Sequence, residues 1–190
     1  MESDGKETQN NSSEVLWKEL RNGNKQALSL LFNRFYDSLY GYGYRIIPED
    51  DRIKDAIQEV FFQLWKYRKN LADVRSVRAY LLMSLRHQLF NDRAVQQRRD
   101  KMNMEYASEE FDIHINYEKW LEILELEKRQ KSKLKEAVKE LSPRQREVIY
   151  LKYYEGLSTE ELSKIMDVRT QSVYNLLVHA IKGLRTHLNL

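Results

Sequence analysis

Apolar residues recur every three to four positions along most of the chain, which is the pattern of amphipathic helices. In the last third, from Leu141 to Leu188, the pattern predicts three helices. Ser142 with Gln145, and Ser158 with Glu161, predict a capping box at the start of each of the first two. A glycine between these two helices, at position 156, suits a C-terminal cap.

The second and third of these helices are predicted to form a helix-turn-helix. Asp167 and Val168 end the second helix, and Thr170 is expected to cap the third. The turn is flanked by apolar anchors at Leu162, Ile165, Val168, Val173 and Leu177. No acidic residue follows Asp167, so the third helix is purely cationic.

The outward face of this third helix predicts DNA binding, because amide and cationic side chains read base edges and phosphates. The candidate residues are Arg169, Gln171, Ser172, Asn175, His179 and Lys182. The alternative is a three-helix packing module with a solvated basic face. Agreement between caps, turn, anchors and charge favours DNA binding.

The first hundred residues predict four more helices. One begins near Glu14, with Val15, Leu16 and Leu20 inward, and ends at the turn signal 22–24. The others cover 27–47, 51–70 and 76–100. Six aromatic residues crowd the second helix and are interpreted as core rather than as a stacking surface: Phe32, Phe35, Tyr36, Tyr40, Tyr42 and Tyr44.

Charge is unevenly distributed, although the net charge is only +3. Residues 74–99 contain six Arg and one acid, which predicts a helix that can follow a phosphate backbone or present a solvated basic face. Residues 100–118 contain six acids, one Lys and no helical period, which predicts a linker. Helix is expected to resume near Tyr117 and to run through Trp120, Leu121, Leu124 and Leu134.

Composition favours an all-α fold, because Pro and Gly are scarce and helix formers are abundant. The chain has no Cys, which excludes disulfides and thiolate metal sites, and no apolar run reaches membrane-spanning length. Its His residues lack paired-ligand spacing, and no cofactor loop or nucleophile–base pair is found. We therefore expect no catalytic residues, no metal and no cofactor.

The motif LSPRQREVIYLKYYEGLSTEELSKIM resembles the promoter-reading C-terminal domain of bacterial sigma factors of the extracytoplasmic-function (ECF) class. The segment DAIQEVFFQLW resembles the signature with which this family docks on the clamp helices of RNA polymerase. That resemblance implies a polymerase-binding set in which acceptors are followed by apolar anchors: Asp55, Gln58, Glu59, Phe62 and Trp65.

The segment RAYLL and the pair Arg86-His87 resemble the family's region that melts and reads the minus-ten promoter element. The minus-ten candidates are Tyr80, Arg86, His87, Asn91, Arg93, Arg98 and Arg99. The chain departs from the family at Tyr80, where Trp is common, and at His87, where Asn is common. It also departs at Tyr174-Asn175, where many relatives carry Lys-Ser, so base preferences do not transfer.

The resemblance implies an all-α sigma factor with two small helical domains joined by an acidic linker, the second being a helix-turn-helix. We expect a disordered tail over 1–13, a polymerase- and minus-ten-binding domain over 14–99, a linker over 100–117 and a minus-thirty-five-binding domain over 118–190.

The expected partners are core RNA polymerase, promoter DNA and an anti-sigma factor, in the cytoplasm and without membrane insertion. The alternatives are a helix-turn-helix regulator that acts without polymerase and, less well supported, a nucleic-acid-modifying enzyme.

Overall fold

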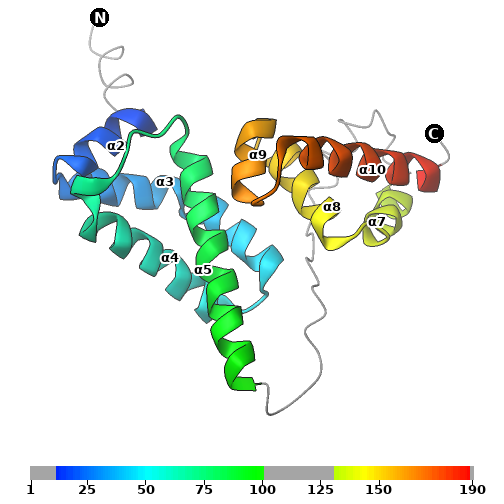
Figure 1. Cartoon of the computed structure of the whole chain (residues 1–190), viewed down its shortest axis with the longest axis horizontal. Coiled ribbons are helices and arrows are strands. Elements are labelled where there is room, and N and C mark those ends of the chain that lie inside the picture. The colour runs from blue at the N-terminus through cyan, green and yellow to red at the C-terminus, as the bar shows by residue number, and fades with distance from the viewer. Residues whose placement is uncertain (1–11, 101–130, 189–190) are drawn as a thin grey trace, which may run out of the picture. The chain divides into compact units, whose positions relative to one another are not determined.

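A computed structural model describes residues 12–100 and 131–188, with the backbone alone at 91–100 and 131–132. The chain divides into two compact units, Met1–Tyr106 and Ala107–Leu190. Within the described ranges, every regular element is a helix (Figure 1). The predicted all-α fold with two helical halves is therefore confirmed.

The N-terminal unit is built around the long helix α3 (Lys25–Ile46). Its described elements are α2 (Ser13–Arg21), α3 (Lys25–Ile46), α4 (Asp50–Lys66), the short 3-10 helix η1 (Arg68–Asn70) and α5 (Val77–Asp100). Helix α3 packs against α2, α4 and α5, and Figure 1 shows it among them. The buried stripe of α4 includes Ile53, Ile57 and Leu64, and that of α5 includes Leu81, Leu82 and Leu85. In α2, the buried residues are Leu16, Trp17 and Leu20, whereas Val15 is only partly covered.

Local caps and one close approach fix the geometry of α2, α3 and α4. The Ser12 hydroxyl accepts from the Val15 N–H at 3.3 Å and starts α2. Asn24 caps α3 by accepting from two backbone N–H groups. At Gly43, an added Cβ would lie 2.8 Å from Cγ2 of Ile53, so this glycine allows α3 and α4 to approach closely.

The C-terminal unit places its last helix against the others. Its described elements are α7 (Lys131–Lys139), α8 (Pro143–Ile149), a π-helical turn η3 (Tyr150–Tyr154), α9 (Thr159–Ile165) and α10 (Thr170–Leu188). Both predicted capping boxes are present, at Ser142 and at Ser158. Gly156 has φ +71°, as expected of a C-terminal cap. Helix α10 packs against α7, α8 and α9.

The interpretation of the α3 aromatic residues as core holds for only two of the six. Phe35 and Tyr42 are buried. The other four lie partly exposed along one flank, with ring centroids 5.2, 6.1 and 6.3 Å apart in succession: Phe32, Tyr36, Tyr40 and Tyr44. A strict spacing of four residues keeps these side chains beside the buried stripe rather than on it.

Some predictions lie wholly or largely outside the described residues. These are the tail over 1–13, the acidic linker over 100–117 and the helix from Tyr117 through Trp120, Leu121 and Leu124. Leu134 is described, and it is buried in α7. The exact domain boundaries remain predictions.

Candidate functional site

The turn between α9 and α10 is closed by backbone hydrogen bonds. The Met166 N–H donates to the Leu162 carbonyl at 2.9 Å, and the Val168 N–H donates to the Ser163 carbonyl at 3.0 Å. Asp167 adopts φ +52°, the left-handed conformation that its position in the turn requires. The predicted helix-turn-helix is thereby confirmed as a local structure.

The start of α10 lies one residue before the predicted position. The carbonyl of Arg169 accepts from the Ser172 N–H at 2.8 Å and from the Val173 N–H at 3.2 Å. Arg169 is therefore the residue that precedes the helix, and Thr170 belongs to its first turn. The prediction that Thr170 caps α10 was wrong, because Arg169 holds the cap position and the backbone of Thr170 is already helical.

The inner face of α10 fixes which side chains point outward. Its buried residues are Val173, Leu177, Ala180, Leu184 and Leu188. Gly183 lies beside the connection between α7 and α8, since an added Cβ there would be 3.4 Å from Cδ2 of Leu141. The opposite face must then lie toward solvent, at about 100° per residue.

Most of the predicted DNA-binding side chains lie on that outward face. Arg169, Gln171, Asn175, His179 and Lys182 are exposed, whereas Ser172 is half-buried. The Gln171 amide donates to the Asn175 amide oxygen at 3.2 Å, which orients the two side chains together. The remaining amide groups of this pair are free to form the bidentate contacts that read a base edge.

The connection from α8 to α9 is held by interactions that the sequence did not predict. The Tyr150 hydroxyl donates to the buried Glu155 carboxylate at 2.8 Å. The ammonium group of Lys152 donates to the Leu157 carbonyl at 3.2 Å. Both contacts bridge the π-helical turn and the cap at Gly156, and so they set where α9 begins.

Helix α5 carries the predicted minus-ten face on its first three turns. His87 is exposed, and the Arg86 guanidinium lies over the Phe90 ring at 4.6 Å. Tyr80 is only half-exposed, because its ring packs edge-on against Trp17 with centroids 5.0 Å apart. The remaining candidates lie on the α5 backbone, but their side chains are outside the described residues: Asn91, Arg93, Arg98 and Arg99.

The predicted polymerase-binding residues share the outward face of α4. Asp55 and Gln58 are exposed, and Phe62 keeps 57% of its surface in solvent. Glu59 is half-buried, and its carboxylate accepts from the Gln63 amide. The fifth residue, at position 65, is a half-buried Trp covered by the Arg68 guanidinium 4.2 Å above its ring. Asp55 and Glu59 make this face of α4 acidic. Phe62 and Trp65 add apolar side chains to it near the C-terminal end of the helix.

Helix α2 holds the connection between α4 and α5, which sequence reasoning missed. The indole N–H of the buried Trp17 donates to the Ala72 carbonyl at 3.1 Å. Arg21 forms an ion pair with Asp73. Both contacts span more than fifty residues of sequence, so no local pattern indicates them. A helical stripe that included Trp17 beside Leu16 would have identified its burial.

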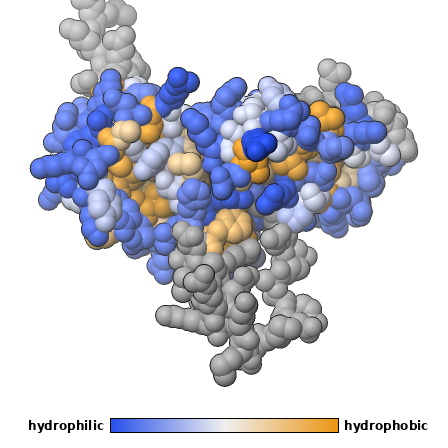
Figure 2. Space-filling view, in the orientation of Figure 1, coloured by the Kyte–Doolittle hydropathy of each residue, from blue (hydrophilic) through white to orange (hydrophobic). Residues whose placement is uncertain are grey.

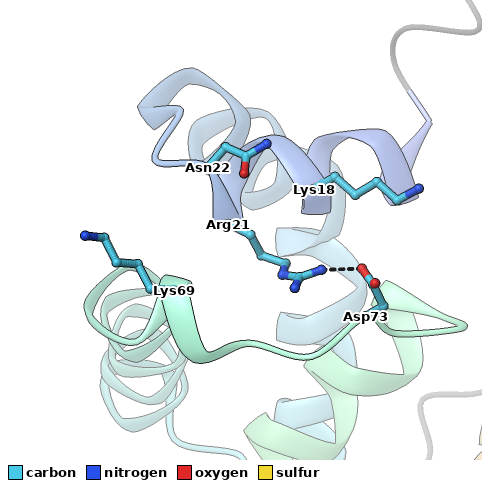
Figure 3. Close-up of a pocket in the computed structure, with 5 residues that line it drawn as sticks. All are labelled: Lys18, Arg21, Asn22, Lys69 and Asp73. Atoms are coloured by element: carbon cyan, nitrogen blue, oxygen red, sulfur yellow. Dashed lines mark hydrogen bonds and ion pairs between the residues drawn. The ribbon is translucent and has the colours of Figure 1, made fainter.

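The same contact encloses a shallow hollow with more cations than acids (Figure 3). Its lining residues are Lys18, Arg21, Asn22, Lys69 and Asp73. Figure 3 shows Arg21 and Asp73 joined in its middle, while the two lysines extend away on either side. The ion pair between Arg21 and Asp73 in this hollow joins α2 to the connection between α4 and α5.

Figure 2 shows mainly hydrophilic side chains on the visible face of each unit, with smaller apolar patches among these side chains. Within residues 12–100 and 131–188, no helix is long and apolar enough to cross a membrane. No group of three or more His, Asp or Glu in the same ranges is placed to hold a metal ion.

Two family models match the chain. Residues 31–99 match the model described as Sigma-70 region 2, and residues 131–184 match that of Sigma-70, region 4. Together the two matches cover more than half of the chain, and they contain α4, α5 except its last residue, the helix-turn-helix and every predicted site residue.

Characterised relatives are similar over nearly the whole length. The ECF RNA polymerase sigma factor SigK of Mycobacterium sp. (strain JLS) is 22% identical over 178 residues, covering 93% of this chain and 91% of the relative. SigK of Mycobacterium bovis (strain BCG / Pasteur 1173P2) is 23% identical over 163 residues, covering 83% and 86%.

Two solved structures share the fold. The sigma factor RpoE, in complex with the anti-sigma factor NepR from Bartonella quintana, has a TM-score of 0.61 and 19% identity, with 85% of this chain and 96% of that chain covered. CnrH, in complex with the cytosolic domain of CnrY, has a TM-score of 0.57 and 22% identity, with 93% and 97% covered.

Proposed function

The chain belongs to the sigma-70 family of RNA polymerase sigma factors, in its ECF class, and from this membership we propose which surface of the chain has which role in transcription initiation. It directs promoter-specific transcription initiation. The exposed face of α10 reads the minus-thirty-five element, and the face of α5 that carries Tyr80 and His87 melts and reads the minus-ten element. Helix α4 docks on core RNA polymerase through Glu59 and its neighbours.

One observation carries the assignment of α10. Its apolar face is buried against the other helices of the unit. The opposite face exposes the amides of Gln171 and Asn175 and the ammonium group of Lys182 to solvent. A helix presented in this way fits the major groove, where amides contact base edges and cations contact phosphates. The lack of acidic residues after Asp167 favours approach to DNA.

Run-off transcription with purified core polymerase tests the proposed function. We expect the chain to direct transcripts from a promoter selected with the holoenzyme, and core polymerase alone to give none from that promoter. A helix-turn-helix regulator would bind its operator without core and would direct no transcript. A nucleic-acid-modifying enzyme would alter the template itself.

The division of roles on α10 has its own test. Asn175→Ala should weaken binding to some upstream sequences more than others, since a good bidentate contact contributes about 1–3 kcal/mol of discrimination. Lys182→Ala should weaken binding to all sequences alike and flatten the log–log salt dependence by roughly one unit. Identical behaviour of both variants on mutated upstream elements would contradict these roles.

We also propose that an anti-sigma factor binds this chain in the cytoplasm and that the chain performs no chemistry of its own. Two solved relatives, RpoE and CnrH, form complexes with NepR and with the cytosolic domain of CnrY. A ligand of this kind would compete with core polymerase for the acidic face of α4. Competition between core polymerase and a co-purified protein partner, measured with the Glu59→Lys variant as control, tests this proposal.

A further inference from the structure

The outward face of α10 contains one side chain that neither the packing nor the polar contacts explain. Val178 is 61% exposed, more than any other large apolar side chain in the part of the chain whose side chains are described. It lies three residues after Asn175 and four before Lys182, so the three share one face of the helix. The buried stripe of α10 does not include it.

The fold gives no reason for a valine at this position. A β-branched residue is a weaker helix former than Ala, Lys or Gln, and an exposed one gains little from packing. Valine is therefore a costlier choice than a polar residue unless its methyl groups meet a ligand. That ligand must be apolar at the point of contact, although the surrounding face is polar and cationic.

The DNA major groove offers one apolar group of this kind. Among the four bases, only thymine presents a methyl group there, beside the donors and acceptors that amide side chains read. We propose that Val178 reads the 5-methyl group of a thymine in the upstream promoter element, next to the base contacted by Asn175. This inference rests on the proposed function, because it requires that α10 lies in the major groove.

A protein partner would also contact an exposed valine, but the surroundings favour DNA. The only other large apolar side chain exposed on the described part of α10 is Tyr174, one turn earlier and 50% exposed. Two side chains form a much smaller patch than protein partners usually cover. The charged residues that follow on α10 are cations, Lys182 and Arg185, which suit phosphates.

The test replaces thymine by deoxyuracil, which removes only the methyl group. The upstream element is first selected from random duplexes with wild-type holoenzyme, and each thymine in it is then exchanged singly. We expect one exchange to weaken wild-type binding about fourfold, the effect of uncovering one methyl group. With Val178→Ala, the same exchange should have no effect, and the binding of the thymine duplex should fall to the deoxyuracil level.

Two variants make the comparison specific. Val178→Thr keeps the shape and one methyl group, so it should retain part of the discrimination. Leu30→Ala removes an exposed apolar side chain from α3 in the other unit and should keep the full fourfold difference. Helical content should match the wild type in all three variants, and all three should remain folded at the assay temperature, since neither position is fully buried.

Several outcomes would overturn the inference. These are a selected element without thymine, equal discrimination by wild type and Val178→Ala, and a variant that loses only its association with a protein partner. None of these would remove the proposed function, which holds as long as the wild-type holoenzyme selects one upstream sequence. Failure to select any upstream sequence would instead refute the role of α10.

Discussion

Tyr80 offers the strongest test of the proposed strand-opening role, because its ring belongs to two environments. One edge packs against Trp17 inside the N-terminal unit, with centroids 5.0 Å apart and planes at 63°. The side chain as a whole is half-buried at the start of α5, so part of it reaches solvent. Tyr80→Ala should therefore cause two separable losses, one of folding stability and one of promoter opening.

The expected size of each loss follows from these contacts. Complete burial of a large aromatic side chain contributes about 3–5 kcal/mol against Ala, so a half-buried ring contributes about 2 kcal/mol. Of this, the edge-on pair with Trp17 accounts for about 1 kcal/mol. Since small domains unfold with about 5–15 kcal/mol, the variant should remain folded at room temperature. Stacking on one unpaired base contributes about 1–3 kcal/mol, so opening should fall by roughly 5- to 150-fold.

Permanganate footprinting of unpaired thymines, on duplex promoter and on a template mismatched over the melted region, measures the second loss. Tyr80→Phe keeps the ring and should open nearly as well as the wild type. Ile46→Ala removes a buried side chain from the end of α3, should cost about 2–4 kcal/mol and leaves the Tyr80 ring in place. Its opening should be normal, which separates stability from function.

Three results would refute the reasoning. Footprints that are unchanged in Tyr80→Ala would show that this ring takes no part in opening. A defect of the same size in Ile46→Ala would trace the loss to stability alone. A mismatched template that restores nothing would place the defect in polymerase association instead, which a core-binding assay would detect.

Three further predictions concern other parts of the fold. Glu59→Lys should abolish co-elution with core polymerase. The melting temperature should stay close to that of the wild type, because among the described side chains only the Gln63 amide forms a hydrogen bond with this half-buried carboxylate. A large drop in melting temperature would show a structural role. Asp167→Gly should raise the melting temperature slightly. Removing the strain of a side chain in the left-handed conformation gains about 1 kcal/mol, whereas the added backbone entropy of the unfolded chain costs about 0.5–1 kcal/mol. A clear fall in the melting temperature would mean that the Asp167 side chain stabilises the turn. Tyr40 donates to the Asp50 carboxylate at 2.6 Å, and this hydrogen bond raises the pKa of Tyr40 from 10.0 to about 12. The stabilising contribution of this hydrogen bond is present below pH 10 and is lost as pH rises toward 12. The free energy of unfolding, measured with urea, should therefore fall less steeply over that interval for Tyr40→Phe than for the wild type. Parallel pH profiles of the two proteins would contradict this.

The parts of the structure that the sequence predicted are those set by local chemistry. A cap joins residues three positions apart, and a helical face depends on a period of 3.6, so both are visible in a short segment. Ser142, Ser158 and Gly156 therefore mark the observed helix ends. The turn at Asp167 was also predictable, because few residues other than Gly adopt its conformation readily.

The contacts that position the site across the sequence were not predictable in the same way. The hydrogen bond from Trp17 to Ala72 and the ion pair between Arg21 and Asp73 depend on where whole helices pack. The π-helical turn before Glu155 depends on a buried hydrogen bond from Tyr150. Side chains of this kind carry no spacing signal, since each makes one contact that only the folded chain creates.

The candidate DNA-reading side chains on α10 differ from both groups, because they are exposed and make few contacts within the chain. Asn175 touches Gln171, and no contact within the described residues requires Val178. Substitution at such positions costs little folding free energy, usually within about 0.5 kcal/mol. The helix-turn-helix can therefore keep its caps, turn and core while the exposed side chains of α10 vary. Under the proposed role of α10, we expect departures from the family at Tyr174 and Asn175 to change promoter preference and to leave the scaffold unchanged, so the family resemblance predicts the fold but not the promoter sequence.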